Sequence, residues 1–331
     1  MRRQILNLPE NAPEEALDGL ALTNPTLIAY DRERGLVTRA TPARNKVGLV
    51  SGGGSGHEPL HAGFVGSGML DVAVPGAVFA SLTALQVHEG TVAADSGRGV
   101  VQIVKNYTGD VLNFRIAGEL AGDDNAVATE TVLVDDDLAT QSDDGPGRRG
   151  TAAVLAVEKI CGASAEAGAD LHTVAELGRR IARNARTLSF ALSAGTHPGE
   201  TSPAFTLDTA EVELGVGIHG ERGTGRIPFA DADTLIARLV DPLAAELGCT
   251  RGSAVIAIVN GLGGAYPIEL SIAARAVHHR LAGQGITVAR SLAGSYVTSL
   301  DMVGVSVTLL PADADLLPLW DAPVRTPALT W

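Results

Sequence analysis

Short apolar runs alternate with longer helical patterns along the whole chain. Residues 99–105, Gly-Val-Val-Gln-Ile-Val-Lys, form a nearly continuous β-branched run, which is typical of a strand buried on both faces of a sheet. Further strands are predicted at 46–51, 131–137, 188–193, 212–218, 254–259 and 304–310. Helices are predicted at about 111–120, from 151 onward, at 230–247 and at 268–281. This alternation predicts an α/β fold.

The length of 331 residues predicts two domains, each large enough for its own core. We expect an N-terminal α/β domain at 1–186 and a C-terminal α/β domain at 187–331, both built on mostly buried mixed sheets. No proline- or serine-rich linker marks the boundary near 183–195, so we expect the domains to pack tightly. In such folds ligands bind beside strand ends, and we expect the substrate site in that crevice.

Composition narrows the class of protein. The chain is 45% hydrophobic with a formal net charge of −13, which argues against nucleic-acid or anionic-membrane binding. Its two cysteines, Cys161 and Cys249, lack metal-type spacing and are expected to be buried thiols of a cytosolic chain. The amino terminus lacks the apolar core of a signal peptide, and no apolar run reaches the ~18 residues that span a bilayer. We therefore expect a soluble, cytoplasmic protein.

A glycine-rich segment, Gly52-Gly-Gly-Ser-Gly-His-Glu-Pro-Leu-His61, carries the strongest functional signal. It follows the predicted strand at 46–51, and four glycines within five residues let backbone N–H groups approach a ligand closely. His57 comes directly afterwards, at the expected start of a helix. The pattern predicts a small-molecule site at the carboxyl end of a strand.

Two other interpretations of this segment are weaker. His57 to His61 matches the zinc-protease pattern His-Glu-x-x-His, which needs both histidines on one helical face. Pro59 suits only the first turn of a helix and biases Glu58 away from helical dihedrals, so we expect no metal site here. The glycines are not followed by Lys-Ser/Thr, so they do not indicate a nucleotide-binding loop.

Two further segments combine glycine with reactive side chains. His219 lies in Gly215-Val-Gly-Ile-His-Gly-Glu221 at an expected strand end, where its ring either binds a ligand or satisfies a turn carbonyl. Asp110 follows Lys105 at the head of a helix, either as a helix cap or as a general base beside a cation. The acidic run Asp135–Asp137 is interpreted as a solvated strand end rather than a magnesium site.

These segments resemble the dihydroxyacetone kinase family, specifically its substrate-binding K subunit. The resemblance covers essentially the whole chain, in order. Its blocks are Gly52–Pro59, Lys105–Phe114, Gly147-Arg-Arg-Gly-Thr151, Gly215–Glu221, Thr298-Ser-Leu-Asp-Met302 and Trp320–Leu329. The sequence departs from the family pattern in two places. The segment Pro75-Gly-Ala-Val-Phe-Ala-Ser-Leu82 differs from the common Pro-Gly-Glu-Val-Phe-x-Ser-Pro, and Arg222 stands where the family often has proline. They leave the preferred ketose open, including a four-carbon ketose such as erythrulose.

The resemblance implies specific roles for residues of this chain. The expected catalytic residues are His219, Asp110 and His57. His219 is expected to add to the substrate ketone as a hemiaminal, Asp110 to act as base, and His57 to hydrogen-bond the substrate and assist phosphoryl transfer. The expected substrate-binding residues are Gly53, Gly54, Ser55, Gly56 and Lys105.

The resemblance also implies partners. Single-chain ATP-dependent relatives carry a second, nucleotide-binding domain, whereas this chain ends at Trp331. We expect no cofactor on the chain itself, ADP or ATP with Mg²⁺ on a separate L-type subunit, and a homodimer. Truncation of a single-chain kinase, and free ATP rather than a phosphotransferase relay as donor, both stay open. The alternative function is a ketose sensor that acts as a coactivator without catalysis.

Overall fold

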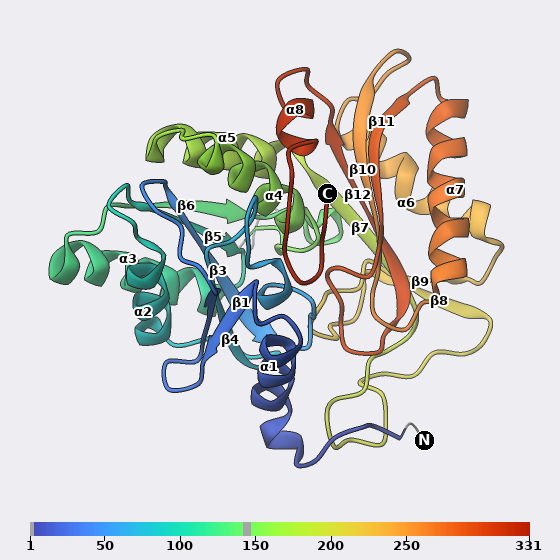
Figure 1. Ribbon diagram of the computed structural model, residues 1–331. Coiled ribbons are helices and arrows are strands. Elements are labelled where there is room, and N and C mark those ends of the chain that lie inside the picture. The colour runs from blue at the N-terminus through green and yellow to red at the C-terminus, as the bar shows by residue number, and fades with distance from the viewer. Residues whose placement is uncertain (1–2, 142–146) are drawn as a thin grey trace. The chain divides into compact units, whose positions relative to one another are not determined.

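The computed structural model describes residues 3–141 and 147–331, which form two compact units (Figure 1). The glycine-loop unit contains Ile5–Val134, Val154–Ala182 and Pro318–Trp331. The His219 unit contains Met1–Gln4, Asp135–Ala153 and Arg183–Leu317. Each unit holds one six-stranded sheet with helices, which confirms the predicted α/β class. The division into domains at 186 and 187 stays a prediction, since both units are assembled from interleaved segments.

The sheet of the glycine-loop unit is mixed, with strand order β1-β2-β4-β3-β5-β6. Four of its strands run parallel, and β1 and β2 form an antiparallel hairpin at one edge. The strands are β1 (Ile28–Asp31), β2 (Leu36–Arg39), β3 (Gly48–Ser55), β4 (Val72–Val78), β5 (Val100–Lys105) and β6 (Thr129–Val134). Because β3 and β5 are parallel neighbours, their carboxyl ends meet at the same edge of the sheet.

Helices cover this sheet (Figure 1). They are α1 (Ala12–Thr23), α2 (Ala84–Ala94), α3 (Thr108–Asn125), α4 (Ala153–Glu166) and α5 (Leu171–Asn184), with 3₁₀ turns η1 (Pro9–Asn11) and η2 (Ala62–Phe64). Helices α2 and α3 pack on one face, where Phe114 joins a core with Val50, Val74 and Val104 of the strands. Burying such aliphatic side chains stabilises the fold by roughly 1.5–3 kcal/mol each.

The sheet of the His219 unit has the order β11-β10-β12-β7-β8-β9, in which only β10 and β11 pair in parallel. Its elements are η3 (Leu138–Thr140), β7 (Arg186–Ser193), β8 (Glu211–Leu214), β9 (Gly225–Pro228), α6 (Ala232–Glu246), β10 (Ala254–Gly261), α7 (Pro267–Gly283), β11 (Thr287–Gly294) and β12 (Val303–Pro311). The predicted leucine stripe of α6, Leu235, Leu239 and Leu243, is buried against the strands. Helix α8 (Leu317–Trp320) follows β12.

Three local predictions are wrong. The strand predicted to end at residue 51 continues through the glycines of residues 52–54 to Ser55, because these glycines pair with β4. No α-helix follows them, since only the short η2 turn forms before β4. Strand β8 ends at Leu214, so His219 lies in the loop beyond the strand rather than at its last residue.

Two observations concern the thiols and the membrane. Cys161 is fully buried as predicted, whereas Cys249 is only partly buried. No helix in the described ranges is both long and apolar enough to cross a membrane.

Candidate functional site

The glycine strand approaches its neighbours too closely for side chains. Gly52 faces Val74 across the β3–β4 ladder, and a Cβ placed on it would lie 2.4 Å from the Val74 carbonyl oxygen. Gly53 has φ +156°, and its Cβ would lie 2.6 Å from Lys105 Nζ and 3.7 Å from Asp110 Oδ2. Glycine at positions 52 and 53 is therefore required by packing, in addition to the predicted role in ligand binding. The lack of side chains there lets Lys105 and Asp110 lie against the backbone of β3.

Lys105 and Asp110 are both buried beside Gly53, with exposed fractions of 1% and 3%. Lys105 is the last residue of β5, and its Nζ donates to the Gly52 carbonyl oxygen at 3.0 Å. Asp110 lies in the first turn of α3, but the N-cap of that helix is Tyr107, so Asp110 is not the cap that the alternative interpretation required. Its Oδ1 is buried without a hydrogen-bond partner among the described residues.

Part of the glycine-rich segment lies next to a cavity. A cavity of about 370 Å³ is lined by Gly53, Gly54 and Ser55, by His61, and by apolar residues of α1 and β4. His57 is 1% exposed, and its ring stacks on Phe79 with centroids 5.1 Å apart. The structure thus gathers the predicted binding residues of the glycine-loop unit around β3, with part of the set at the cavity wall.

The second histidine of the zinc-like pattern has a different environment. His61 Nδ1 lies 2.6 Å from Glu158 Oε1, and His61 Nε2 lies 2.7 Å from Lys105 Nζ. Both ring nitrogens are therefore engaged by protein groups, which leaves neither for a metal. Over the described residues, no group of three or more His, Cys, Asp or Glu side chains is arranged to hold a metal ion.

In the His219 unit, Glu221 holds the histidine. The His219 backbone N–H donates to Glu221 Oε2 at 2.8 Å, and its Nδ1 lies 3.4 Å from Glu221 Oε1. The His219 side chain is 19% exposed. Burial raises the pKa of Glu221, but its hydrogen bond and charge interaction with His219, together with the charge of Arg149, outweigh this and bring the pKa to about 2. The carboxylate is thus ionised at neutral pH and orients the Nδ1 side of the ring.

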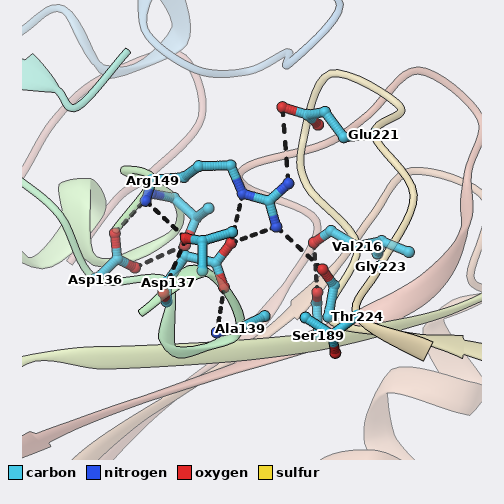
Figure 2. A network of polar contacts seen from close by, with 12 residues as sticks. Asp136, Asp137, Ala139, Arg149, Ser189, Val216, Glu221, Gly223 and Thr224 are labelled. Carbon is cyan, nitrogen blue, oxygen red and sulfur yellow. Dashed lines mark hydrogen bonds and ion pairs between the residues drawn. The ribbon is translucent and has the colours of Figure 1, made fainter. Parts of the chain in front are cut away.

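Behind Glu221 lies a network of polar contacts (Figure 2). Arg149 Nη1 is 3.9 Å from Glu221, its Nη2 donates to the Gly215 carbonyl at 3.0 Å, and its guanidinium pairs with Asp137 at 2.7 Å. Asp136 accepts bonds from the Thr151 backbone N–H at 2.6 Å and its hydroxyl at 2.8 Å. These contacts tie the loop of His219 to the segment 136–151 of the same unit.

The acidic run is therefore not a solvated strand end, and that prediction is wrong. Asp136 and Asp137 are 0% and 2% exposed, because Arg149 and Thr151 come back to meet them. Burial raises the pKa of Asp137, and Arg149 limits the rise, so that it reaches about 6. The sequence signal for this pairing is the Gly147–Thr151 block, whose two arginines, Arg148 and Arg149, follow the acidic run along the chain.

The comparisons with known proteins agree with this architecture. The Dak1 domain family matches residues 18–328, and the chain belongs to that family. It is 41% identical, over 99% of both chains, to the dihydroxyacetone-binding subunit DhaK of the PEP-dependent dihydroxyacetone kinase of Escherichia coli K12. The resemblance found in the sequence is thereby confirmed.

Two solved structures resemble this chain closely. A dihydroxyacetone kinase operon co-activator matches with a TM-score of 0.90 and 32% identity, over 96% of this chain and 98% of that one. The dihydroxyacetone kinase of C. freundii matches with a TM-score of 0.88 and 34% identity. That match covers all of this chain but 60% of the C. freundii chain.

Proposed function

We propose that this protein is the substrate-binding subunit of a dihydroxyacetone kinase, and that a separate subunit brings the nucleotide. Similarity to the DhaK subunit of E. coli over nearly the full length supports the assignment. The structural observation that carries it is Asp110, a buried carboxylate beside Lys105 whose Oδ1 has no hydrogen-bond partner among the described residues. A buried acceptor of this kind suits a substrate hydroxyl, because an unsatisfied buried polar group is costly.

The proposed binding step is covalent. Glu221 orients the Nδ1 side of the His219 ring, and Nε2 is the nitrogen that we propose adds to the carbonyl carbon of the ketose. The ring gives up one proton and the carbonyl oxygen gains one, so the hemiaminal is neutral. A covalent bond of this kind selects carbonyl compounds over polyols such as glycerol. His57 is the proposed hydrogen-bond partner of the substrate.

The proposed catalytic step uses Asp110. Its carboxylate removes the proton of the terminal hydroxyl, which then attacks a phosphoryl group carried by the partner. The Lys105 ammonium beside it and the backbone of Gly53–Gly56 hold the substrate. The reaction joins two molecules, the phosphoryl donor and the ketose. Because the bound ketose is held in one place, its hydroxyl is already positioned for attack, and this positioning accounts for much of the rate.

Two variants test these roles. Intact-mass spectrometry with dihydroxyacetone should show one added substrate on the wild type and none on His219→Ala. His172→Ala is the matched control, because its side chain is 75% exposed and far from the loop in sequence. Asp110→Asn should keep the adduct and lose about 10²–10⁴ in turnover with the nucleotide subunit. An adduct on His219→Ala, or normal turnover by Asp110→Asn, would refute the assigned role.

A second candidate function is a cytoplasmic ketose sensor. The structural similarity to an operon co-activator favours it, since the two chains match over almost their whole length. A sensor needs the covalent histidine but not a base. Turnover of dihydroxyacetone by the chain mixed with a nucleotide-binding L-type subunit and phosphoryl donor supports the kinase, whereas adduct formation without turnover supports the sensor.

The partners follow from the same proposal. We propose that the isolated chain binds Mg-ATP weakly or not at all, because no Gly-Lys-Ser/Thr loop follows its glycines. Calorimetry with Mg-ATP and a phosphorylation assay with and without the L-type subunit test this, and turnover by the chain alone would contradict it. We also propose a homodimer; light scattering that shows a 33.9 kDa particle at micromolar concentration would contradict that.

A further inference from the structure

Three ionisable side chains form a buried line that ends at the substrate-binding residues of the glycine-loop unit. Glu158 of α4 is 0% exposed, His61 in the turn after β3 is 6% exposed, and Lys105 of β5 is 1% exposed. Glu158 Oε1 lies 2.6 Å from His61 Nδ1, and His61 Nε2 lies 2.7 Å from Lys105 Nζ. Each group comes from a different element, so the fold must bring them together.

Glu158 is unexpected where it lies. It belongs to α4, a helix that is buried almost throughout, and a lone ionised carboxylate would be costly there. Its Oε2 has no hydrogen-bond partner within the described part of the chain. The contact with His61 is thus the one hydrogen bond by which the carboxyl group is linked to the substrate-binding residues. A leucine or alanine would fill the helix interior without this cost, which points to a role for the charge.

The groups that face Lys105 and its neighbours define the local charge. Burial lowers the pKa of Lys105, and the charges of Asp110 and Glu158 raise it again in part. Burial, then the Lys105 and His57 charges, lower the pKa of His61 well below 6.5, which leaves a neutral imidazole. Such a ring carries one proton and can therefore donate on one side and accept on the other.

At the far end of the line, the carboxyl group shares its surroundings with a thiol. Burial raises the pKa of Glu158, while the charge of Lys105 and the hydroxyl of Ser51 act against the rise. Cys161 lies on the same helix, and burial followed by the charge of Glu158 raises its pKa to about 12, so it stays a neutral thiol. The ionisable groups at the two ends of the line are thus Glu158 and Lys105.

Two arrangements with the same number of protons fit these distances. In the first, Lys105 is an ammonium that donates to His61 Nε2, and the proton on Nδ1 is donated to an ionised Glu158. In the second, one proton has moved from Lys105 to Nε2 and the Nδ1 proton has moved to Glu158, which leaves an amine, a neutral ring and a carboxylic acid. The line can therefore exchange a proton between Lys105 and Glu158 without solvent.

We propose that Glu158 and His61 are positioning residues that keep Lys105 charged beside Asp110 and let that charge relax when Asp110 takes up a proton. While Asp110 is ionised, the first arrangement supplies its counter-charge. Once Asp110 is neutral, the ammonium loses that partner, and the second arrangement removes the unpaired charge. This rests on the proposed function, since it assumes that Asp110 is the base.

Glu158→Gln tests the proposal, because it keeps the shape of the side chain and removes its charge. Without that charge the pKa of Lys105 falls, so the alkaline limb of the pH profile of kcat should move to lower pH. We expect a shift of about one pH unit, at the lower end of the effect of a nearby opposite charge because the imidazole separates the two groups. Above the shifted midpoint, turnover should be about tenfold below that of the wild type.

Controls separate this effect from a structural one. Glu166→Gln lies on the same helix and loses an ion pair with Arg39 at 2.8 Å, so it should leave the alkaline midpoint unchanged. Glu158→Asp keeps the charge and should keep the midpoint even if kcat falls. The His219 adduct should form in every variant, as read by intact mass. A wild-type midpoint in folded Glu158→Gln would overturn the proposal.

A measurement on the wild type keeps the proposal testable if Glu158→Gln does not fold. Nitrogen-15 spectra of the His61 ring should show a neutral imidazole at pH 7 with its proton on Nδ1, and a doubly protonated ring would overturn the proposal. Failure of the proposed function has a different signature: the wild type would not turn over with the nucleotide subunit at any pH. If only the proposed role of Glu158 and His61 is wrong, the wild type still turns over with the nucleotide subunit.

Discussion

Gly53→Ala is the substitution whose effect the structure defines most sharply. The added Cβ would lie 2.6 Å from Lys105 Nζ, so the ammonium must retreat by about 0.8 Å to reach the 3.4 Å of an ordinary contact. That movement stretches its bonds to the Gly52 carbonyl, now 3.0 Å, and to His61 Nε2, now 2.7 Å. Hydrogen bonds to a charged group contribute about 1.5–3 kcal/mol each. The backbone, at φ +156°, adds strain of about 1–3 kcal/mol.

The expected result is a protein that folds with lower stability and turns over about 10²-fold more slowly, because a misplacement of about 1 Å at a reacting group has that scale. The assay is ketose phosphorylation with the nucleotide subunit, paired with the urea midpoint of unfolding. Gly97→Ala is the matched control: Gly97 also has positive φ, +87°, but its Cβ would meet nothing within 4 Å. It should lose stability and keep its turnover. Wild-type turnover by Gly53→Ala would refute the reasoning.

Two further substitutions and one labelling experiment test the fold. Asp136→Ala leaves the buried N–H groups of Thr151 and Ala153 without an acceptor, so the free energy of unfolding in urea should fall by about 1–3 kcal/mol for each group. Unchanged stability would contradict this. Thr83→Ala removes the N-cap of the capping box of α2 and should lower the unfolding free energy by only about 1 kcal/mol. Iodoacetamide should label the partly buried Cys249 before Cys161, whose thiol pKa burial raises to about 12; mass spectrometry that finds Cys161 labelled first in the native protein would contradict this.

Local sequence patterns were enough to predict much of the architecture. The run at 99–105 became β5, and the leucine stripe at 235, 239 and 243 became the buried face of α6. Both predictions succeed because a strand buried on both faces and an amphipathic helix each impose their own period on the chain. The placement of Lys105 near the glycine strand also follows, since parallel strands share a carboxyl edge.

Patterns failed where the conformation of a segment depends on a partner far away in sequence. The strand was predicted to end at residue 51, but pairing with β4 extends it through the glycines at 52–54. The acidic run at 135–137 read as solvated, but Arg149 and the residues near it bury Asp136 and Asp137. A charged residue in the sequence cannot be assigned to the surface or the interior from its charge alone. The cost of burying it is lowered by an oppositely charged partner, and that partner can lie anywhere along the chain.

The residues alone are enough to predict the α/β class and the resemblance to the family that the Dak1 domain match confirms. They also suffice to propose His57, Asp110 and His219 as candidate reactive residues. The tertiary structure decided which groups surround them. Glu158 meets His61 although 97 positions separate them, and Glu221 turns back on His219 within one loop. Proton positions and orientations at the candidate site depend on such contacts, and these exist only once the packed core has fixed each helix and strand in place.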